Sequence, residues 1–94
     1  MKLAKVVGSC VSTIKQSELK GFKMLLVQDF SAIEKKAFGT PFIAVDTVGA
    51  GDGEIVCVVQ GTPAQRLLGP QNLPVDAAIV AIVDSFSLAK QEED

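Results

Sequence analysis

The chain has 94 residues, which is enough for one small hydrophobic core and one domain. Hydrophobic residues make up 48% of the chain and charged residues 21%, and this composition excludes an intrinsically disordered protein. Acidic residues outnumber basic residues by 11 to 9, so the net charge of -2 does not favour a surface that binds nucleic acid. The sequence contains no His, Tyr or Trp, which removes the commonest general base, a common transition-metal ligand and the usual platforms for base stacking.

Targeting and membrane signals are also missing from the sequence. The longest apolar runs, such as residues 77–83, are far too short to cross a bilayer. Residues 1–8 contain a basic residue but no sustained apolar stretch and no cleavage signature of a signal peptide. We therefore expect a cytoplasmic protein with no membrane partner, in which Cys10 and Cys57 are reduced thiols and not a disulfide.

The hydrophobic pattern predicts a mostly β chain. In chain order, the predicted strands are residues 3–14, 22–30, 41–46, 54–60 and 77–85. The first strand is long, and Gly8 in its middle predicts a bend or a bulge. Polar, glycine-containing or proline-containing segments between the strands predict surface loops, at residues 15–21, 31–40, 47–53 and 70–76.

A short helix is predicted over residues 62–69. Thr62 suits the N-cap, Pro63 the first helical position and Gly69 a left-handed C-terminal residue. Five strands with one late helix predict an all-β fold, a small five-stranded OB-like β-barrel, in a single domain over residues 1–94. Residues 86–94, which end in a charged segment, are expected to form a mobile C-terminal tail.

Several predicted strands are apolar on both faces. The clearest runs are residues 24–27, 55–59 and 77–83. A small barrel has only one interior, so alternate side chains of these runs must point outward. Outward Val, Ile and Leu side chains would either be covered by the helix and loops or form a surface for self-association, and we favour self-association.

The most unusual segment is the glycine-rich run at residues 46–54. It does not match a dinucleotide-binding fingerprint, because Glu54 stands where the third Gly is required and a strand follows instead of a helix. Asp46, Asp52 and Glu54 could ligate calcium, but their spacing is not that of an EF-hand. The favoured interpretation is structural: alternate glycines allow main chain to pass close to main chain, in a turn or against a neighbouring subunit.

Catalysis and nucleic-acid binding have little support. No His is available to activate a Ser or Cys nucleophile, and Asp76 and Asp84 more often cap turns or pair across interfaces than act as an acid–base pair. The sequence therefore predicts no enzyme, no cofactor and no metal. An oligonucleotide-binding barrel is kept as the alternative function, although the eight Lys do not cluster and the only stacking candidates are Phe22, Phe30, Phe38, Phe42 and Phe86.

Three regions of the chain resemble one known family. The matching stretches are residues 1–8, 11–13 and 21–28, then the glycine-rich 45–54, then 74–84. In this order they resemble the vertex proteins of bacterial microcompartments, which include carboxysomes and the ethanolamine, propanediol and glycyl-radical metabolosomes. The resemblance implies an OB-like barrel that forms a homopentamer and caps the five-fold vertices of a shell built mainly of hexameric shell proteins. It implies a structural protein in a shell within the cytoplasm, with no catalytic residues.

Seven residues are predicted to make subunit contacts or line the ring axis. They are Gly49, Ala50, Gly51, Asp52, Gly53, Arg66 and Asp76. Members of the family often have Arg at the position of Gln65, and the sequence alone does not assign a role to Arg66 one position later. Ala81 stands where Gly is common. The cargo enzymes, the conductance of a central opening and the face that points to the lumen cannot be derived from the sequence.

Overall fold

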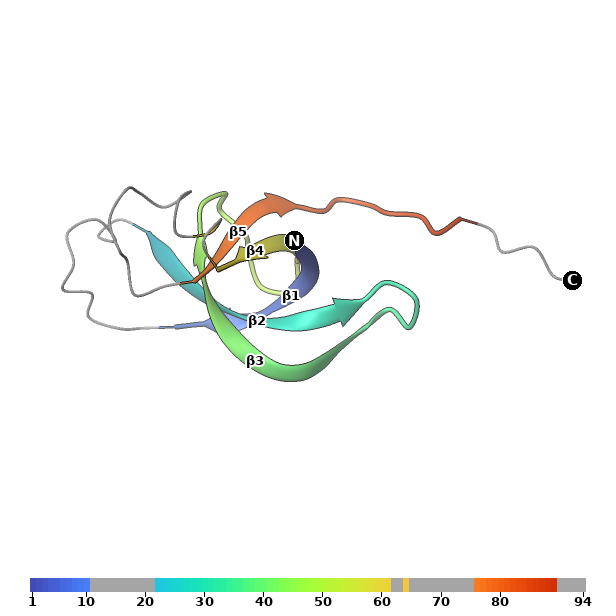
Figure 1. Cartoon of the computed structure of the whole chain (residues 1–94), viewed down its shortest axis with the longest axis horizontal. Coiled ribbons are helices and arrows are strands. Elements are labelled where there is room, and N and C mark those ends of the chain that lie inside the picture. The colour runs from blue at the N-terminus through green and yellow to red at the C-terminus, as the bar shows by residue number, and fades with distance from the viewer. Residues whose placement is uncertain (11–21, 62–63, 65–75, 90–94) are drawn as a thin grey trace, which may run out of the picture.

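The computed structural model describes residues 1–10, 22–61, 64 and 76–89, which form a five-stranded β-barrel (Figure 1). The strands are β1 (Lys2–Ser9), β2 (Lys23–Ser31), β3 (Lys36–Asp46), β4 (Ile55–Gln60) and β5 (Ala77–Ile82). They close in the order β1-β2-β3-β5-β4, which confirms the predicted all-β, five-stranded barrel. The predicted helix at 62–69 lies outside the described residues, apart from Ala64, as do residues 90–94 of the predicted tail. Within the described part of the chain, no helix has the length and apolar character that crossing a membrane requires.

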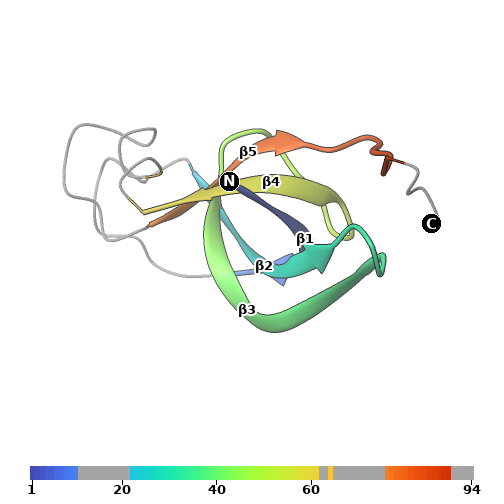
Figure 2. The same ribbon diagram turned by 45° about the vertical axis from the view of Figure 1, so that its right-hand side comes forward.

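One seam of the barrel is short. β1 pairs antiparallel with both β2 and β4, and the pairs β2–β3 and β4–β5 are also antiparallel. The β3–β5 pair is parallel and consists of Val45 opposite Ala78 and Asp46 opposite Ile79. Figure 2 shows β3 curving around the barrel so that only its last residues meet β5. Closure of the barrel therefore depends on the end of β3.

The predicted irregularity in the first strand is confirmed. The β1–β2 register shifts between Val6 and Gly8, which places Val7 in a bulge where 41% of the residue is exposed. A bulge bends the strand and increases its twist, and this allows β1 to pair with neighbours on both of its edges. The strand itself ends at Ser9, whereas the prediction extended to residue 14; residues 11–14 lie outside the described part of the chain.

The predicted surface loop at residues 31–40 is wrong for most of its length. β3 begins at Lys36, and only residues 32–35 form the turn from β2. The β2–β3 register shifts between Val27 and Asp29, so that three residues, 39–41, lie opposite Gln28. The Gln28 Nε2 donates to the Gly39 carbonyl at 2.6 Å, and Gly39 has a φ of 78°. Gly39 and Pro41 thus mark a bulge within β3, and Pro41 does not start the strand as the sequence predicted.

The barrel interior is filled by small and branched aliphatic side chains. Ala4, Val6, Leu25, Val27, Ala44, Ala50, Val56, Val58, Ala77 and Ile79 form one buried cluster. A second cluster consists of Val45, Ala64 and Ala78, with Phe22, Met24 and Val59 packed against it. Val45 and Ala78 belong to strand faces that point out of the barrel, since their chain neighbours Ala44, Ala77 and Ile79 belong to the interior cluster.

The chain itself therefore covers part of the outward apolar surface through Ala64. At Val45 and Ala78 the alternative that the sequence analysis weighed therefore holds, because the chain itself covers these outward side chains. Large hydrophobic side chains remain exposed elsewhere on the described surface, and they are Met1, Val7, Ile33, Phe38, Ile43, Val48, Phe86 and Leu88.

Truncation of the central core residue Ile79 should destabilise the barrel. Ile79 is fully buried, so Ile79→Ala is expected to lower the free energy of unfolding by about 3 kcal/mol, and Ile79→Val by about 1 kcal/mol. Urea denaturation at a fixed protomer concentration measures this change. Ile33→Ala, at a residue that is 77% exposed in the β2–β3 turn, is the control and should change the value by less than about 0.5 kcal/mol. Equal losses for Ile79→Ala and Ile33→Ala would contradict the assigned core.

Candidate functional site

Residues 47–53, the glycine loop, connect β3 to β4 and are fastened to the buried carboxylate of Asp46. The Asp46 Oδ1 accepts the backbone N–H groups of Val48 and Gly49, each at 3.0 Å, and its Oδ2 accepts that of Ala50 at 2.9 Å. Asp46 is 7% exposed and is the last residue of β3. Three charge-assisted bonds from consecutive amides compensate the buried carboxylate and fix the first half of the loop.

The second half of the glycine loop is held by Glu54 and by β1. The Glu54 Oε1 accepts the Gly51 N–H at 2.6 Å, and the Glu54 N–H donates to the Gly51 carbonyl at 3.1 Å. Gly53 donates its N–H to the Val6 carbonyl at 2.8 Å, and Val6 donates to the Glu54 carbonyl at 3.0 Å. The loop therefore continues into the β1–β4 ladder and is a rigid part of the barrel.

The glycine loop also plugs the barrel. The Thr47 Oγ1 donates to the Ile79 carbonyl of β5 at 2.6 Å, so the loop is bonded to β5 as well as to β1. Ala50 is 2% exposed and belongs to the interior cluster. Its neighbours Val48 and Asp52 are exposed, as are Thr47, Gly49 and Gly53. The glycine loop thus buries the methyl group of Ala50 in the barrel and exposes residues 47–49, 52 and 53 to solvent.

The glycines are required by the loop's own conformation. Gly49 and Gly53 have φ values of 80° and 83°, a region that other residues rarely adopt. A Cβ at either position would meet no atom within 4 Å. At Gly51 a Cβ would lie 3.4 Å from the Glu54 Oε1 that the loop uses as an acceptor. Close approach of a neighbouring subunit, which the sequence analysis predicts, stays a prediction.

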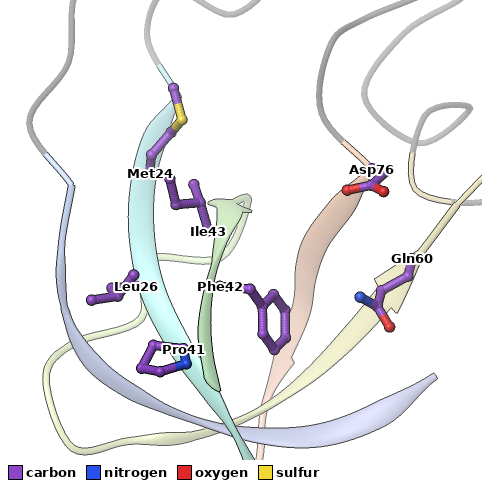
Figure 3. A pocket seen from close by; sticks show the side chains of 7 residues that line it. All are labelled: Met24, Leu26, Pro41, Phe42, Ile43, Gln60 and Asp76. Carbon is purple, nitrogen blue, oxygen red and sulfur yellow. The ribbon is translucent and has the colours of Figure 1, made fainter. Parts of the chain in front are cut away.

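A separate apolar groove lies where β3 and β5 diverge (Figure 3). Among the described residues, it is lined by Met24, Leu26, Pro41, Phe42, Ile43, Gln60 and Asp76 and encloses about 690 Å³. Met24 and Leu26 come from β2, and the next three residues come from β3. Figure 3 places Gln60 and Asp76 on the opposite side, at the end of β4 and just before β5.

The described residues offer no cluster of side chains suited to binding a metal. No group of three or more Cys, Asp or Glu side chains among them could hold a metal ion. Both oxygens of Asp46 already accept backbone N–H groups, so Asp46 is not a free ligand for calcium. Cys57 lies in β4 and Cys10 directly follows β1, and both are free thiols.

Comparison with known proteins places the barrel in a family. Residues 1–84 match the family model described as ethanolamine utilisation protein EutN/carboxysome. The chain belongs to the EutN/CcmL family. A microcompartment shell vertex protein, GrpN of Rhodospirillum rubrum (strain F11), is 44% identical over 87 residues, which cover 90% of this chain and 94% of GrpN. The carboxysome shell vertex protein CcmL of Thermosynechococcus vestitus is 41% identical over 88 residues, covering 93% of this chain and 87% of CcmL.

Solved structures of EutN/CcmL proteins share the fold. The structure described as the GrpN pentameric microcompartment shell protein from Rhodospirillum rubrum matches with a TM-score of 0.80 at 40% identity. The match covers 95% of this chain and 100% of the GrpN chain. Both the fold class and the family resemblance predicted from the sequence are therefore confirmed.

The structure separates the seven predicted contact residues of this EutN/CcmL chain into groups. Gly49, Ala50, Gly51, Asp52 and Gly53 lie together in the glycine loop, with Ala50 facing the core and unavailable for a contact through its side chain. Asp76 is exposed and lines the groove, where β5 begins. Arg66 lies outside the described residues. The six described residues thus lie on two different parts of the chain, the glycine loop and the start of β5.

The sequence analysis missed the roles of Asp46 and Glu54. It considered them only as calcium ligands, whereas they fasten the glycine loop. The available signal was an Asp followed directly by a run of small residues with free amides, the pattern of a side chain that accepts local backbone N–H groups. No local sequence pattern indicated the groove, because residues of β2, β3 and β4 and the residue before β5 meet there only in the folded barrel.

Removal of the Asp46 carboxylate should loosen the glycine loop. Asp46→Ala leaves three amides without their acceptor, and we expect the free energy of unfolding to fall by about 2 kcal/mol. Hydrogen exchange at Val48, Gly49 and Ala50 should accelerate. The control is Glu34→Ala, at an exposed carboxylate in the β2–β3 turn, and its effect should stay below about 0.5 kcal/mol. Unchanged amide protection in Asp46→Ala would contradict the clamp.

Proposed function

We propose that this chain is a structural shell protein that forms a cyclic pentamer and caps the five-fold vertices of a bacterial microcompartment. The observation that carries the proposal is the match over 95% of the chain to a pentameric shell protein, at 40% identity and a TM-score of 0.80. At this identity and coverage, both the protomer fold and its mode of association are expected to be shared. The protein would act in the shell, inside the cytoplasm.

The chemistry of the barrel supports a structural role. Its described interior is packed with aliphatic side chains, among them Ala50 of the glycine loop, as in a small barrel whose interior the side chains fill. The exposed large hydrophobic side chains, among them Phe38, Ile43 and Leu88, are available for association. Stable protein interfaces bury about 1,600 Å² in total, and apolar side chains of this kind supply much of the stabilisation at their centre.

The rigid glycine loop supports a contact at the ring axis or with a neighbouring subunit. Residues 47–49, 52 and 53 are exposed, and the hydrogen bonds of Asp46, Glu54 and Val6 hold their main chain in place. A pre-organised main-chain surface loses little conformational entropy when a second subunit packs against it. We assign Gly49, Gly51, Asp52 and Gly53 to this contact.

Hexameric shell proteins are the expected partners of the pentamer. Hexagonal units alone tile a flat sheet, so a closed polyhedral shell requires five-fold units at its corners. The relatives are themselves described as shell vertex proteins, which supports the same place in the shell for this chain.

A bulky side chain in the glycine loop should impair ring assembly. The purified wild-type chain is expected to have the mass of a pentamer by native mass spectrometry, and Gly51→Val should shift it toward smaller species. Glu34→Val, which adds the same side chain in the exposed β2–β3 turn, should leave the pentamer intact. Circular dichroism verifies that both variants are folded. A full pentamer yield in Gly51→Val would remove the glycine loop from the interface, and a monomeric wild type would overturn the proposed function.

The vertex role is tested with the hexameric shell proteins of the same cell. Their co-expression with this chain should produce closed, roughly isometric particles, because five-fold units allow the hexagonal sheet to close. Without this chain, open sheets or tubes should form. Electron microscopy distinguishes the two results, and identical closed particles in the presence and absence of the chain would contradict the vertex role.

A further inference from the structure

The segment after β5 leaves the barrel as an extended, exposed chain. Residues 83–89, the C-terminal arm, carry no regular secondary structure, and in Figures 1 and 2 they run outward from the end of β5. The last backbone bond of this region joins the Val83 N–H to the Ile55 carbonyl at 2.8 Å. From Asp84 to Ala89 every residue is exposed, including Phe86 at 40% and Leu88 at 54%.

The arm is an apolar binding element with a defined direction. Phe86 packs edge-on against Phe30 of β2, with ring centroids 6.3 Å apart and an interplanar angle of 76°. This contact fixes the base of the arm against its own barrel. Leu88 lies two residues further along and shares a face with Phe86 in an extended chain, whereas Ser87 lies on the other face. The arm therefore presents Leu88 beyond the edge of its own protomer.

The apolar groove at the β3–β5 seam offers a complementary site. Its wall of Met24, Leu26, Pro41 and Ile43 is open to solvent, and Ile43 is 47% exposed. A cavity of about 690 Å³ is large enough for a leucine side chain and the adjoining main chain. Asp76 and Gln60 on the opposite side supply polar groups for the backbone of an inserted segment.

The arm of a protomer is directed away from its own groove. Asp76 lines the groove and directly precedes β5, whereas the arm leaves from the other end of β5 and continues outward in both views (Figures 1 and 2). An arm that occupies this groove must therefore come from a second copy. A contact between two different surfaces of identical subunits is heterologous, and repeated contacts of this kind form a ring when the rotation between subunits closes.

We propose that Leu88 in the C-terminal arm of one protomer inserts into the β2–β3 side of the groove of the next protomer. The insertion covers exposed apolar surface on both partners and links each subunit to its neighbour around the ring. This inference rests on the proposed pentamer and names the segment that joins its subunits. Asp76 then lies at a subunit contact, as the sequence analysis predicts.

Substitution at Leu88 tests the energetic part of the inference. Leu88→Ser removes the inserted side chain but no core residue, so the protomer should fold while the concentration for half-maximal assembly rises about tenfold or more. Ser87→Ala, at the adjacent residue on the other face of the arm, should leave assembly unchanged. Native mass spectrometry across a dilution series measures both. Unchanged assembly in Leu88→Ser, with a pentameric wild type, overturns the insertion alone, whereas a monomeric wild type overturns both the insertion and the proposed pentamer.

Disulfide trapping tests the position of the arm. In a Cys10→Ala, Cys57→Ala background, Leu88→Cys combined with Ile43→Cys should oxidise to a ladder of covalent oligomers that extends to the pentamer. The reason is that each subunit provides the arm for the link to one neighbour and the groove for the link to the other. The matched control combines Leu88→Cys with Ile33→Cys, an exposed residue of the β2–β3 turn, and should give no ladder. An intrachain disulfide in the first variant, or equal ladders in both, would overturn the proposal.

Discussion

The barrel depends on how its shortest seam is closed, and Asp46 is central to that closure. Only two residue pairs join β3 to β5, and Asp46 opposite Ile79 is one of them. The side chain of the same Asp46 accepts three hydrogen bonds from the backbone N–H groups of the glycine loop. The next residue, Thr47, donates its hydroxyl to the Ile79 carbonyl. A buried carboxylate is stable only when hydrogen bonds replace its hydration, so the glycine loop and the seam stabilise each other.

This closure fills the described interior of the barrel with the chain's own side chains. Ala50 reaches the core from the glycine loop, and the remaining interior is filled by aliphatic side chains. Among the described residues, no group of three or more side chains could hold a metal ion. What remains is an exterior with rigid main chain at one place and exposed apolar side chains at others, which suits a building block of a larger assembly.

The sequence predicted local structure correctly where a single residue type dictates the backbone conformation around it. Gly8 predicted a bulge because a residue without a side chain permits a sharp bend, and the register does shift beside it. The sequence pattern wrongly predicted a loop at residues 31–40, because an exposed strand can be as polar as a loop. Pro41 added to this error, because it marks a bulge inside β3 and not the start of the strand. The apolar exterior was predicted at residues 24–27, 55–59 and 77–83, but Ala64 packs against Ala78, and the exposed Ile43 and Phe38 lie outside those runs.

The sequence by itself determined the class of the fold, the family and the absence of His, Tyr and Trp. These follow from the composition, from the alternation of apolar and polar residues and from the order of motifs along the chain. Only the tertiary structure decided which carboxylates fasten the glycine loop, which apolar faces the chain covers and where a groove remains. Those properties depend on strands that are distant in the sequence, such as β2, β3 and β5, and their spacing is set by the shifts in register and the short parallel seam. No local pattern along the chain encodes that distance.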